Sequence, residues 1–338
     1  MSGLPLNSSS PVTEPRRFTR ALLLPVILGC LLQSGLVAAE PDQAVRWLER
    51  VSQAARSLNY EGVFVYQHRG RLEAMRIFHR ADGGGERERL FSLTGSAREI
   101  IRDNQKVACF LPDSRSVVVD QRQIANPLTQ LVPKDVDSLS RSYELRVTGE
   151  GRVAGRPATR IGIIPRDQYR FGYGLWIDQE TGLLLQAEVF GEQGALIEQL
   201  MFTELRILET IPESMLEPQL AGEDFNWFPE TPLQAMEDAR SGWTLGQLPP
   251  GFELVLHERR RLPGSEQPVE HLLLSDGLAS VSVYVEKAGT VDGFNGHSQM
   301  GAVNAYGRLL DDGIQITAVG EVPAITVEAI GESVRPGD

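Results

Sequence analysis

Cysteine is nearly absent from this sequence of 338 residues. Cys30 lies in an apolar N-terminal run and Cys109 lies in the stretch KVACFLPD. If the N-terminal run is removed, a single thiol is left, and it cannot form an internal disulfide. We therefore expect a chain that depends on its hydrophobic core for stability, with Cys109 as a small buried residue of a strand.

The motifs of common enzyme classes are also missing. There is no G-x-S-x-G elbow and no phosphate-binding loop that ends in Gly-Lys-Ser/Thr. The consecutive acids Asp311 and Asp312 lie in a turn, where aspartate is expected for backbone reasons. None of the histidines forms a helical metal-binding pair; they are His68, His79, His257, His271 and His297. The sequence predicts no catalytic residue, no metal and no cofactor.

Long apolar runs are limited to the first residues of the chain. Arg16, Arg17 and Arg20 precede an apolar run from Ala21 to Val37, and the small residues Ala38 and Ala39 follow it. This order is typical of a secretory signal peptide. We expect residues 1–39 to be cleaved and the mature chain to be exported to the periplasm in soluble form.

A lipid anchor at Cys30 is the alternative. The preceding residues Ile27, Leu28 and Gly29 loosely resemble a lipid-attachment box. Leu31 and Leu32 follow Cys30, whereas polar residues usually follow the lipidated cysteine of a lipoprotein. The cleaved signal peptide is therefore the preferred reading.

The net charge is strongly negative, at −12 for the whole chain. A chain of this charge is a poor partner for nucleic acids or for an anionic membrane surface. Its length predicts two domains.

The first domain is predicted over residues 40–208. Apolar residues recur at helical spacing from Pro41 to Leu58, which predicts a helix with one apolar stripe. Ten or eleven short strands, separated by turn residues, follow between Tyr60 and Leu208. Short connections favour antiparallel neighbours, and a long antiparallel sheet tends to curl into a barrel or half-barrel.

Two readings of the concave side of such a sheet stay open. In the first, the helix and the sheet fill the space as an ordinary core. In the second, they leave an apolar pocket that accepts an acyl chain. The residues that would line this pocket are Phe64, Tyr66, Met75, Ile77, and either Leu175 or Trp176, because the strand phase that faces inward is not fixed by the sequence.

Residues 209–240 are predicted to be a linker, because they contain four prolines and many acids. A smaller β-sheet domain is predicted over residues 241–335, with hairpin turns at Asp276-Gly277 and Asp312-Gly313 and a final helix from Pro323. Three consecutive arginines, Arg259, Arg260 and Arg261, stand out in this acidic chain. They are either a solvated strand end or a contact for an anionic ligand or partner.

With these residues in view, the chain resembles the MucB/RseB family of periplasmic regulators of an envelope-stress sigma factor. The stretches that carry the resemblance include NYEGVFVYQHRGRLEAMRIFHRADGGG, FGYGLWIDQETGLLLQAEVF, GWTLGQLPPGFEL and HLLLSDGLASVSVYVE. Where the family usually has Arg-Tyr-Gly before the central hairpin, this chain has Arg170-Phe171-Gly172.

The resemblance implies both a fold and a function. It implies a large unclosed antiparallel β-barrel of the LolA/LolB type with a plugging helix, and a smaller antiparallel β-sheet domain with a helix. It implies binding to the periplasmic domain of a membrane anti-sigma factor of the MucA/RseA type, which is thereby shielded from proteolysis so that the sigma factor stays inactive. Lipid or lipopolysaccharide signals would release the anti-sigma factor from this protein. Whether the chain forms a homodimer is left open.

Two rival functions stay open beside the regulatory one. A periplasmic lipid or lipoprotein carrier would use the same fold and would release its cargo to an acceptor. An envelope hydrolase would need a nucleophile and a base that the sequence does not reveal.

Overall fold

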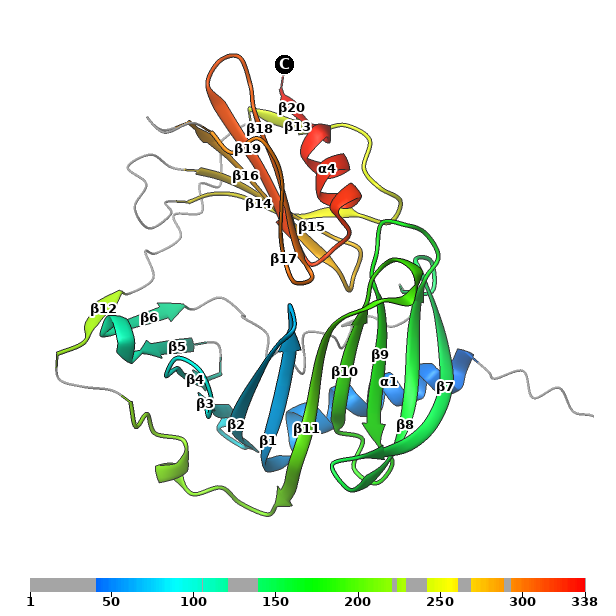
Figure 1. Ribbon diagram of the computed structural model, residues 1–338, viewed down its shortest axis with the longest axis vertical. Helices are drawn as coiled ribbons and strands as arrows, with labels where there is room; N and C mark the ends of the chain where they lie inside the picture. The colour runs from blue at the N-terminus through cyan, green and yellow to red at the C-terminus, as the bar shows by residue number, and fades with distance from the viewer. Residues whose placement is uncertain are drawn as a thin grey trace, which may run out of the picture. The chain divides into compact units, whose positions relative to one another are not determined.

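The computed structural model describes residues 41–104, 106–120, 139–220, 224–228, 242–260, 269–288 and 293–337. The expected signal peptide and Cys30 lie outside these ranges. Within them, no helix has both the length and the apolar character needed to cross a bilayer. The described strands form one sheet of twelve, one of six and one of two (Figure 1).

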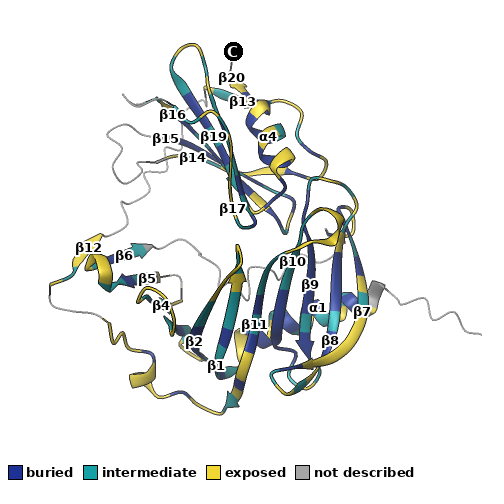
Figure 2. Cartoon of the chain, in the orientation of Figure 1, coloured by how far each residue is buried: buried dark blue, intermediate teal, exposed yellow. Residues whose placement is uncertain are grey.

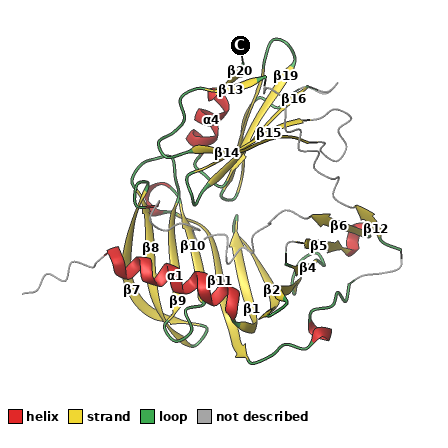
Figure 3. Cartoon of the chain, turned by 180° about the vertical axis from the view of Figure 1, so that it is seen from behind, coloured by secondary structure: helices red, strands yellow, loops and turns green. Residues whose placement is uncertain are grey.

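Helix α1 (Pro41–Ser57) confirms the first predicted helix. Its apolar stripe is buried, with Ala44, Leu48 and Val51 fully shielded from solvent. Figure 3 shows α1 lying across the strands of the large sheet. Burial of an apolar stripe against a sheet supplies most of the stability of a helix of this length.

The large sheet is antiparallel throughout, apart from one short strand at an end. Its strand order is β12-β6-β5-β4-β3-β2-β1-β11-β10-β9-β8-β7, so that β12 and β7 are its two ends and it is not closed. This confirms the predicted unclosed, mostly β architecture. The strands are β1 (Asn59–His68), β2 (Arg71–Asp82), β3 (Gly85–Ser92), β4 (Glu99–Asp103), β5 (Lys106–Leu111), β6 (Ser116–Asp120), β7 (Tyr143–Val153), β8 (Arg156–Pro165), β9 (Gly172–Asp178), β10 (Leu184–Phe190), β11 (Leu196–Leu208) and β12 (Asn226–Phe228). Short 3-10 helices are η1 (Pro112–Ser114), η2 (Glu192–Gly194) and η3 (Glu213–Met215).

Two neighbouring strands at the centre of this sheet, β1 and β11, come unusually close together. The register shifts between Val63 and Phe64, as in a β-bulge. A Cβ atom on Gly62 would stand 2.7 Å from the backbone oxygen of Glu204 and 2.7 Å from the ring of Phe202. Only glycine fits this close backbone approach without a shift of the partner strand.

The small sheet has the order β14-β15-β16-β19-β18-β17. Its strands are β14 (Glu253–Arg260), β15 (Val269–Ser275), β16 (Ser280–Lys287), β17 (Gly296–Met300), β18 (Val303–Leu309) and β19 (Ile314–Gly320), and β13 (Trp243–Leu245) pairs with β20 (Val334–Pro336). Helix α4 (Ala324–Ser333) follows Pro323 as predicted. Its Val327 and Ile330 are buried in a core with Leu272 and Val283 of the sheet. Figure 2 shows that α4 carries both buried and exposed residues.

The first half of the predicted linker packs on the large sheet. Ile211 and Leu216 form a small apolar cluster with Phe78 of β2. Glu213 pairs with Arg80 at 2.9 Å and also with Arg87. The carboxylate of Glu99, fully buried, accepts hydrogen bonds from the backbone N–H groups of Gln219 and Leu220 at 2.9 and 2.7 Å. This segment, residues 209–220, is called the docked segment below.

The packing of α1 leads to a first prediction. Leu48→Ala should lower the free energy of unfolding by about 2–5 kcal/mol, because it removes buried methyl groups and leaves a cavity in the main core. Glu49→Ala, at an exposed position on the same helix, should change it by less than about 0.5 kcal/mol. Urea unfolding followed by circular dichroism measures both. Equal effects of the two substitutions would show that α1 is not part of the core.

A buried histidine predicts a pH dependence of stability. The ring of His79 stacks on Tyr60 with centroids 4.8 Å apart, and its Nδ1 lies 2.9 Å from the carbonyl oxygen of Leu58. Burial lowers the pKa of His79, although the Leu58 carbonyl acts in the opposite direction. The neutral imidazole is therefore favoured in the folded state, and the unfolded state binds more protons as the pH falls below about 6.5.

We expect the wild-type chain to lose stability between about pH 7 and about pH 5 in part through this group. In His79→Phe, which keeps an aromatic ring at the site, the loss over the same interval should be smaller. Urea unfolding at both pH values, compared between the two proteins, isolates the effect because the other titrating groups are shared. An equal or steeper loss in His79→Phe would contradict it.

Candidate functional site

Four of the predicted pocket residues lie on the same face of two paired strands. Phe64 is the register partner of Met75, and Tyr66 and Ile77 follow at the alternate positions of the same phase. Phe64, Met75 and Ile77 are each 5% exposed or less and belong to the main core, and Tyr66 packs against it. The strand phase that the sequence left open is thus fixed for β1 and β2.

The two alternative pocket residues, Leu175 and Trp176, are neighbours in β9, and their side chains therefore lie on opposite faces of the sheet. Leu175 is fully buried in the main core, beside its register partners Ile161 and Ala187. Trp176 is only partly buried and meets Arg160 on the other face, with the guanidinium 5.9 Å from its ring centroid. Leu175 is therefore the inward residue of the pair.

These placements bear on the two readings of the concave side. In this conformation the inward residues are packed in one continuous core together with Leu48 and Val51 of α1. An acyl chain would reach them only if α1 or a strand moved, because closely packed interiors hold no space for such a guest. Lipid binding by these residues stays a prediction.

A larger cavity lies at the rim of the same strands. It has a volume of about 700 Å³ and is lined by the start of β2, the β3–β4 loop and the β5–β6 connection. Arg98 lines it and ends 3.4 Å from Glu73 and 3.6 Å from the sulfur of Met75, which connects the rim to the packed inner face. Its lining is mostly polar, with Leu72 and Leu111 as its large apolar residues, and Arg98 links it to Met75 of the packed core.

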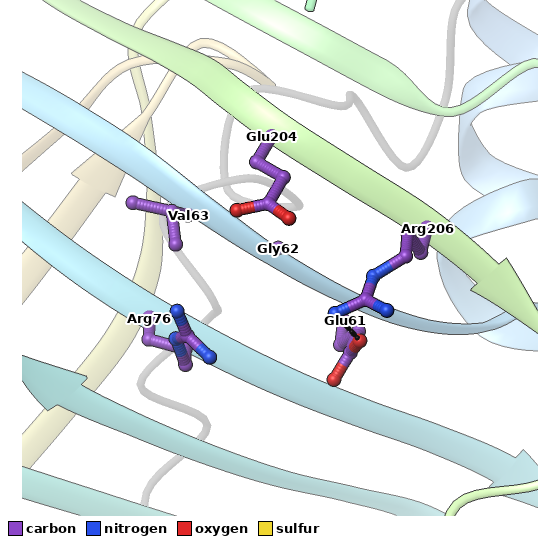
Figure 4. Close-up of a pocket in the computed structure, with 6 residues that line it drawn as sticks. All are labelled: Glu61, Gly62, Val63, Arg76, Glu204 and Arg206. Atoms are coloured by element: carbon purple, nitrogen blue, oxygen red, sulfur yellow. Dashed lines mark ion pairs between the residues drawn. The ribbon is translucent and has the colours of Figure 1, made fainter.

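A second indentation, on the outer face of the sheet, is too small for a ligand. Its volume is about 10 Å³, roughly the space of one water molecule. Figure 4 shows Glu61 and Arg206 paired beside it, with their nearest atoms 2.6 Å apart. Arg76 and Glu204 line it as well, so that charges of both signs surround the close approach at Gly62.

The three consecutive arginines are only partly described. Arg259 donates from Nε to Glu270 of β15 at 2.6 Å, and the same carboxylate contacts Nε2 of His257 at 2.7 Å. Arg260 belongs to β14 by its backbone, and Arg261 lies outside the described residues. For Arg259 the structure provides a partner within the small sheet, and its role in binding an external anion stays a prediction.

Arg170 joins the large and the small sheet at a buried site that the sequence analysis did not identify. Its side chain and that of Asp276 are both fully buried, and Arg170 Nε donates to Asp276 Oδ2 at 2.5 Å. The hydroxyl of Tyr143 donates to the same oxygen at 3.0 Å. The guanidinium also donates to Asp167 and to the carbonyl oxygen of Pro250. We call Arg170, Asp276 and Tyr143 the junction triad.

Aromatic rings and a glycine complete the surroundings of the junction triad. The Arg170 guanidinium lies 5.1 Å from the ring centroid of Phe252 and 5.8 Å from that of Tyr143. Burial and the neighbouring Tyr173 and Asp276 raise the pKa of Tyr143, so its hydroxyl stays a donor. Gly251 has φ +81, and a Cβ there would stand 2.8 Å from Arg170 Nη2.

Two further hydrogen bonds cross between the sheets. The hydroxyl of Thr326 donates to the carbonyl oxygen of Tyr169 at 2.8 Å. The carboxylate of Glu198 accepts from the backbone N–H of Ala302 at 2.7 Å and from the hydroxyl of Tyr66. Glu198 thus ties the small sheet to a residue of the candidate lipid site.

One polar cluster in the small sheet has the hydrogen-bond connectivity of a hydrolase catalytic triad, in which an acid contacts a histidine and the histidine contacts a serine. His271 Nδ1 lies 3.2 Å from Glu258 Oε1, and its Nε2 lies 3.1 Å from Ser282 Oγ. Ser282, however, is in the middle of β16 and is paired with strands on both sides. The backbone N–H groups around it serve the sheet and are not arranged as an oxyanion hole. Among the described residues, no group of His, Cys, Asp and Glu is placed to hold a metal ion.

The junction triad predicts a large penalty for removing one partner. Arg170→Met should lower the free energy of unfolding by about 3–5 kcal/mol, because it leaves the Asp276 carboxylate buried and unpaired. The double variant Arg170→Met/Asp276→Leu should recover part of that loss, since no charge is then left in the interior. Arg146→Met, which removes an exposed pair with Glu144, is the matched control and should change little. A loss from Arg170→Met no larger than that of the control would show that the pair is not buried in solution.

Comparisons with known proteins point to the same family along nearly the whole chain. The MucB/RseB N-terminal domain matches residues 43–220 and the MucB/RseB C-terminal domain matches residues 237–335. The sigma factor AlgU regulatory protein MucB of Pseudomonas aeruginosa is 35% identical over 326 residues, which cover 94% of this chain and 98% of that protein. The sigma-E factor regulatory protein RseB of Escherichia coli is 29% identical over 313 residues, which cover 92% and 96% of the two chains.

Solved structures show the same similarity. The MucB chain of the Pseudomonas aeruginosa MucA/MucB complex aligns with a TM-score of 0.69 and 34% identity, over 88% of this chain and 99% of that one. A structure of MucB in complex with MucA(peri) aligns with a TM-score of 0.67 and 34% identity, over 87% and 99% of the two chains. On the matched domains and on these full-length similarities, the chain belongs to the MucB/RseB family.

Proposed function

We propose that this chain binds the periplasmic domain of a MucA-type anti-sigma factor and shields it from proteolysis, so that the stress sigma factor stays inactive. The observation that carries the proposal is the similarity, over 88% of this chain, to MucB in its complex with MucA. The regulatory names of the relatives from Pseudomonas aeruginosa and Escherichia coli support it. The expected signal peptide would bring the chain to the periplasm, where such a domain is exposed.

The chain acts in this proposal as a binding protein and performs no reaction. The one triad-like cluster of the described residues lacks a set of donors for an oxyanion, and its histidine is stacked on Tyr284 with centroids 4.8 Å apart. Binding and release are then sufficient for regulation, because protease access to the partner is what changes.

The release signal in this proposal is an amphiphile with an anionic head group. The rim cavity offers Arg71 and Arg98 for the head group, and Arg98 contacts the sulfur of Met75 on the inner face. Apolar chains would enter the core from this rim as α1 or a neighbouring strand shifts.

Linkage between the two ligands provides the mechanism. Tyr66, on the inner face, bonds to Glu198, and Glu198 holds Ala302 of the small sheet. An amphiphile that moves Tyr66 therefore disturbs a contact between the sheets. If the partner prefers the undisturbed arrangement, each ligand weakens the other by the same factor.

A lipid or lipoprotein carrier is the second candidate, favoured by the same rim cavity next to an apolar core. A carrier would bind its cargo as tightly without an anti-sigma factor as with one and would pass it to an acceptor. Acyl chains that copurify with the chain and transfer to acceptor vesicles would favour this function.

The linkage predicts a measurable loss of partner affinity. Isothermal titration of the periplasmic domain of the anti-sigma factor should give an affinity that falls about 5–150-fold when a lipid A-like amphiphile is present at saturation. Arg98→Glu should reduce the effect of the amphiphile, because it reverses a charge at the rim. Arg146→Glu, on β7 away from the cavity, is the matched control and should leave the effect unchanged. Equal affinities of the wild-type chain with and without amphiphile would exclude the linkage.

A further inference from the structure

The end of the large sheet at β6 is covered by a segment from the predicted linker. β12 pairs with β6 through Asn226↔Ser116, Trp227↔Val117 and Phe228↔Val118. This is the single parallel pairing among the described strands of that sheet. Parallel pairs are slightly less stable per residue than antiparallel ones, and this one is only three residues long.

β12 is poorly packed for a segment that contains two large aromatic residues. Trp227 is 58% exposed and Phe228 is 55% exposed. The rings of Trp227 and Phe110 form a T-shaped pair with centroids 6.0 Å apart, and Phe110 itself is almost fully buried. Little apolar surface is therefore lost from water when β12 docks. Among the contacts of the described residues, β12 is held by the few backbone bonds of the pairing and by the ring contact of Trp227 with Phe110.

The preceding docked segment is held much more firmly. Its Glu213 pairs with two arginines of the sheet, and its Leu216 is fully buried. Two backbone N–H groups at its end, those of Gln219 and Leu220, bond to the buried carboxylate of Glu99. The difference places the detachable part of the linker at β12 and not at the docked segment.

β6 offers a longer edge than β12 uses. β6 runs from Ser116 to Asp120, whereas β12 pairs only with its first three residues. Val118 on this strand is 43% exposed. An antiparallel strand could pair with the whole of β6 and would compete well with β12, because an uncovered strand edge is a ready template for another chain.

We propose that the β6 edge is a docking site for an extended segment of the anti-sigma factor's periplasmic domain, which replaces β12 by strand addition. The proposal rests on the proposed function for the identity of the partner. β12 shows the chemistry that this edge accepts: an extended backbone with an aromatic side chain placed over Phe110. The partner segment should therefore carry an aromatic residue at the position that Trp227 occupies.

Replacement of β12 by a partner strand would also affect the linker between the two domains. β12 lies between residue 220, where the first family domain ends, and residue 237, where the second begins. While β12 is paired, the chain between the two domains is fixed at this point. A partner that takes its place releases that restraint, so that occupation of the edge and the pairing of β12 are linked.

A reversible covalent lock tests the replacement directly. Ser116→Cys and Asn226→Cys, which are register partners, would form a disulfide across β6 and β12 in a mature chain that also carries Cys109→Ser. Affinity for the periplasmic domain of a MucA-type anti-sigma factor is measured for the oxidised and the reduced form of this one protein. We expect the oxidised form to bind at least tenfold more weakly and the reduced form to bind like the Cys109→Ser parent.

Equal affinity of the oxidised and reduced forms would overturn the docking site while leaving the proposed function intact. Absence of binding by the Cys109→Ser parent and by the wild-type chain would instead remove the proposed function itself. The two failures are therefore distinguishable in one titration series.

A second variant should raise the affinity for the partner, whereas the disulfide should lower it. Trp227→Ser removes the side chain that holds β12 over Phe110 and leaves β6 unchanged, so partner affinity should rise several-fold. Tyr306→Ser, at an aromatic residue of the small sheet, is the control and should not raise it. A fall in affinity for Trp227→Ser would contradict the replacement of β12 and favour direct contact of Trp227 with the partner.

Discussion

The arginine side chain of Arg170, which has no access to solvent, connects the two sheets of this protein. Its guanidinium contacts Asp276 and Pro250 from the small-sheet side, and Asp167 and Tyr143 from the large-sheet side. A charge this deep is retained only where it is paired and where its remaining donors are satisfied. The relation between the sheets therefore depends on a contact that is either complete or absent, which makes intermediate arrangements costly.

Such an all-or-none contact is suited to regulation by ligands. The junction triad and the bridge from Tyr66 through Glu198 to Ala302 connect the inner face of the large sheet with the small sheet. A ligand that disturbs either contact changes the free energy of the whole arrangement and not only that of its own site. Regulation by binding alone needs no more chemistry than this.

The sequence was sufficient to predict the elements that follow periodic patterns. The helices at 41–57 and 324–333 and most strands were predicted because apolar residues recur with the period of each element. β17 (Gly296–Met300) was missed, since its residues are largely polar and show no alternation. β12 was assigned to the linker, because its three residues follow a proline-rich and acidic stretch.

The contacts between distant parts of the chain could not be predicted in the same way. Asp276 was predicted as a turn residue, and it does accept from the backbone of Leu278 and Ala279 through Oδ1. Its other oxygen is the partner of Arg170, which is 106 positions away in the sequence. Local patterns report what a residue does for its own turn, whereas a pairing over such a separation depends on the whole fold. The stretch around Arg170 and the stretch around Gly251 both carried the family resemblance, and that was the available signal.

The most direct test of the account is the distance between the two sheets in solution. Spin labels at the exposed positions Glu150 and Asp312, in a mature chain with Cys109→Ser, report this distance by pulsed electron resonance. We expect one distance distribution for the free chain and a different one when a lipid A-like amphiphile is bound. A distribution that is unchanged by saturating amphiphile would contradict the claim that ligand binding and the arrangement of the sheets are linked.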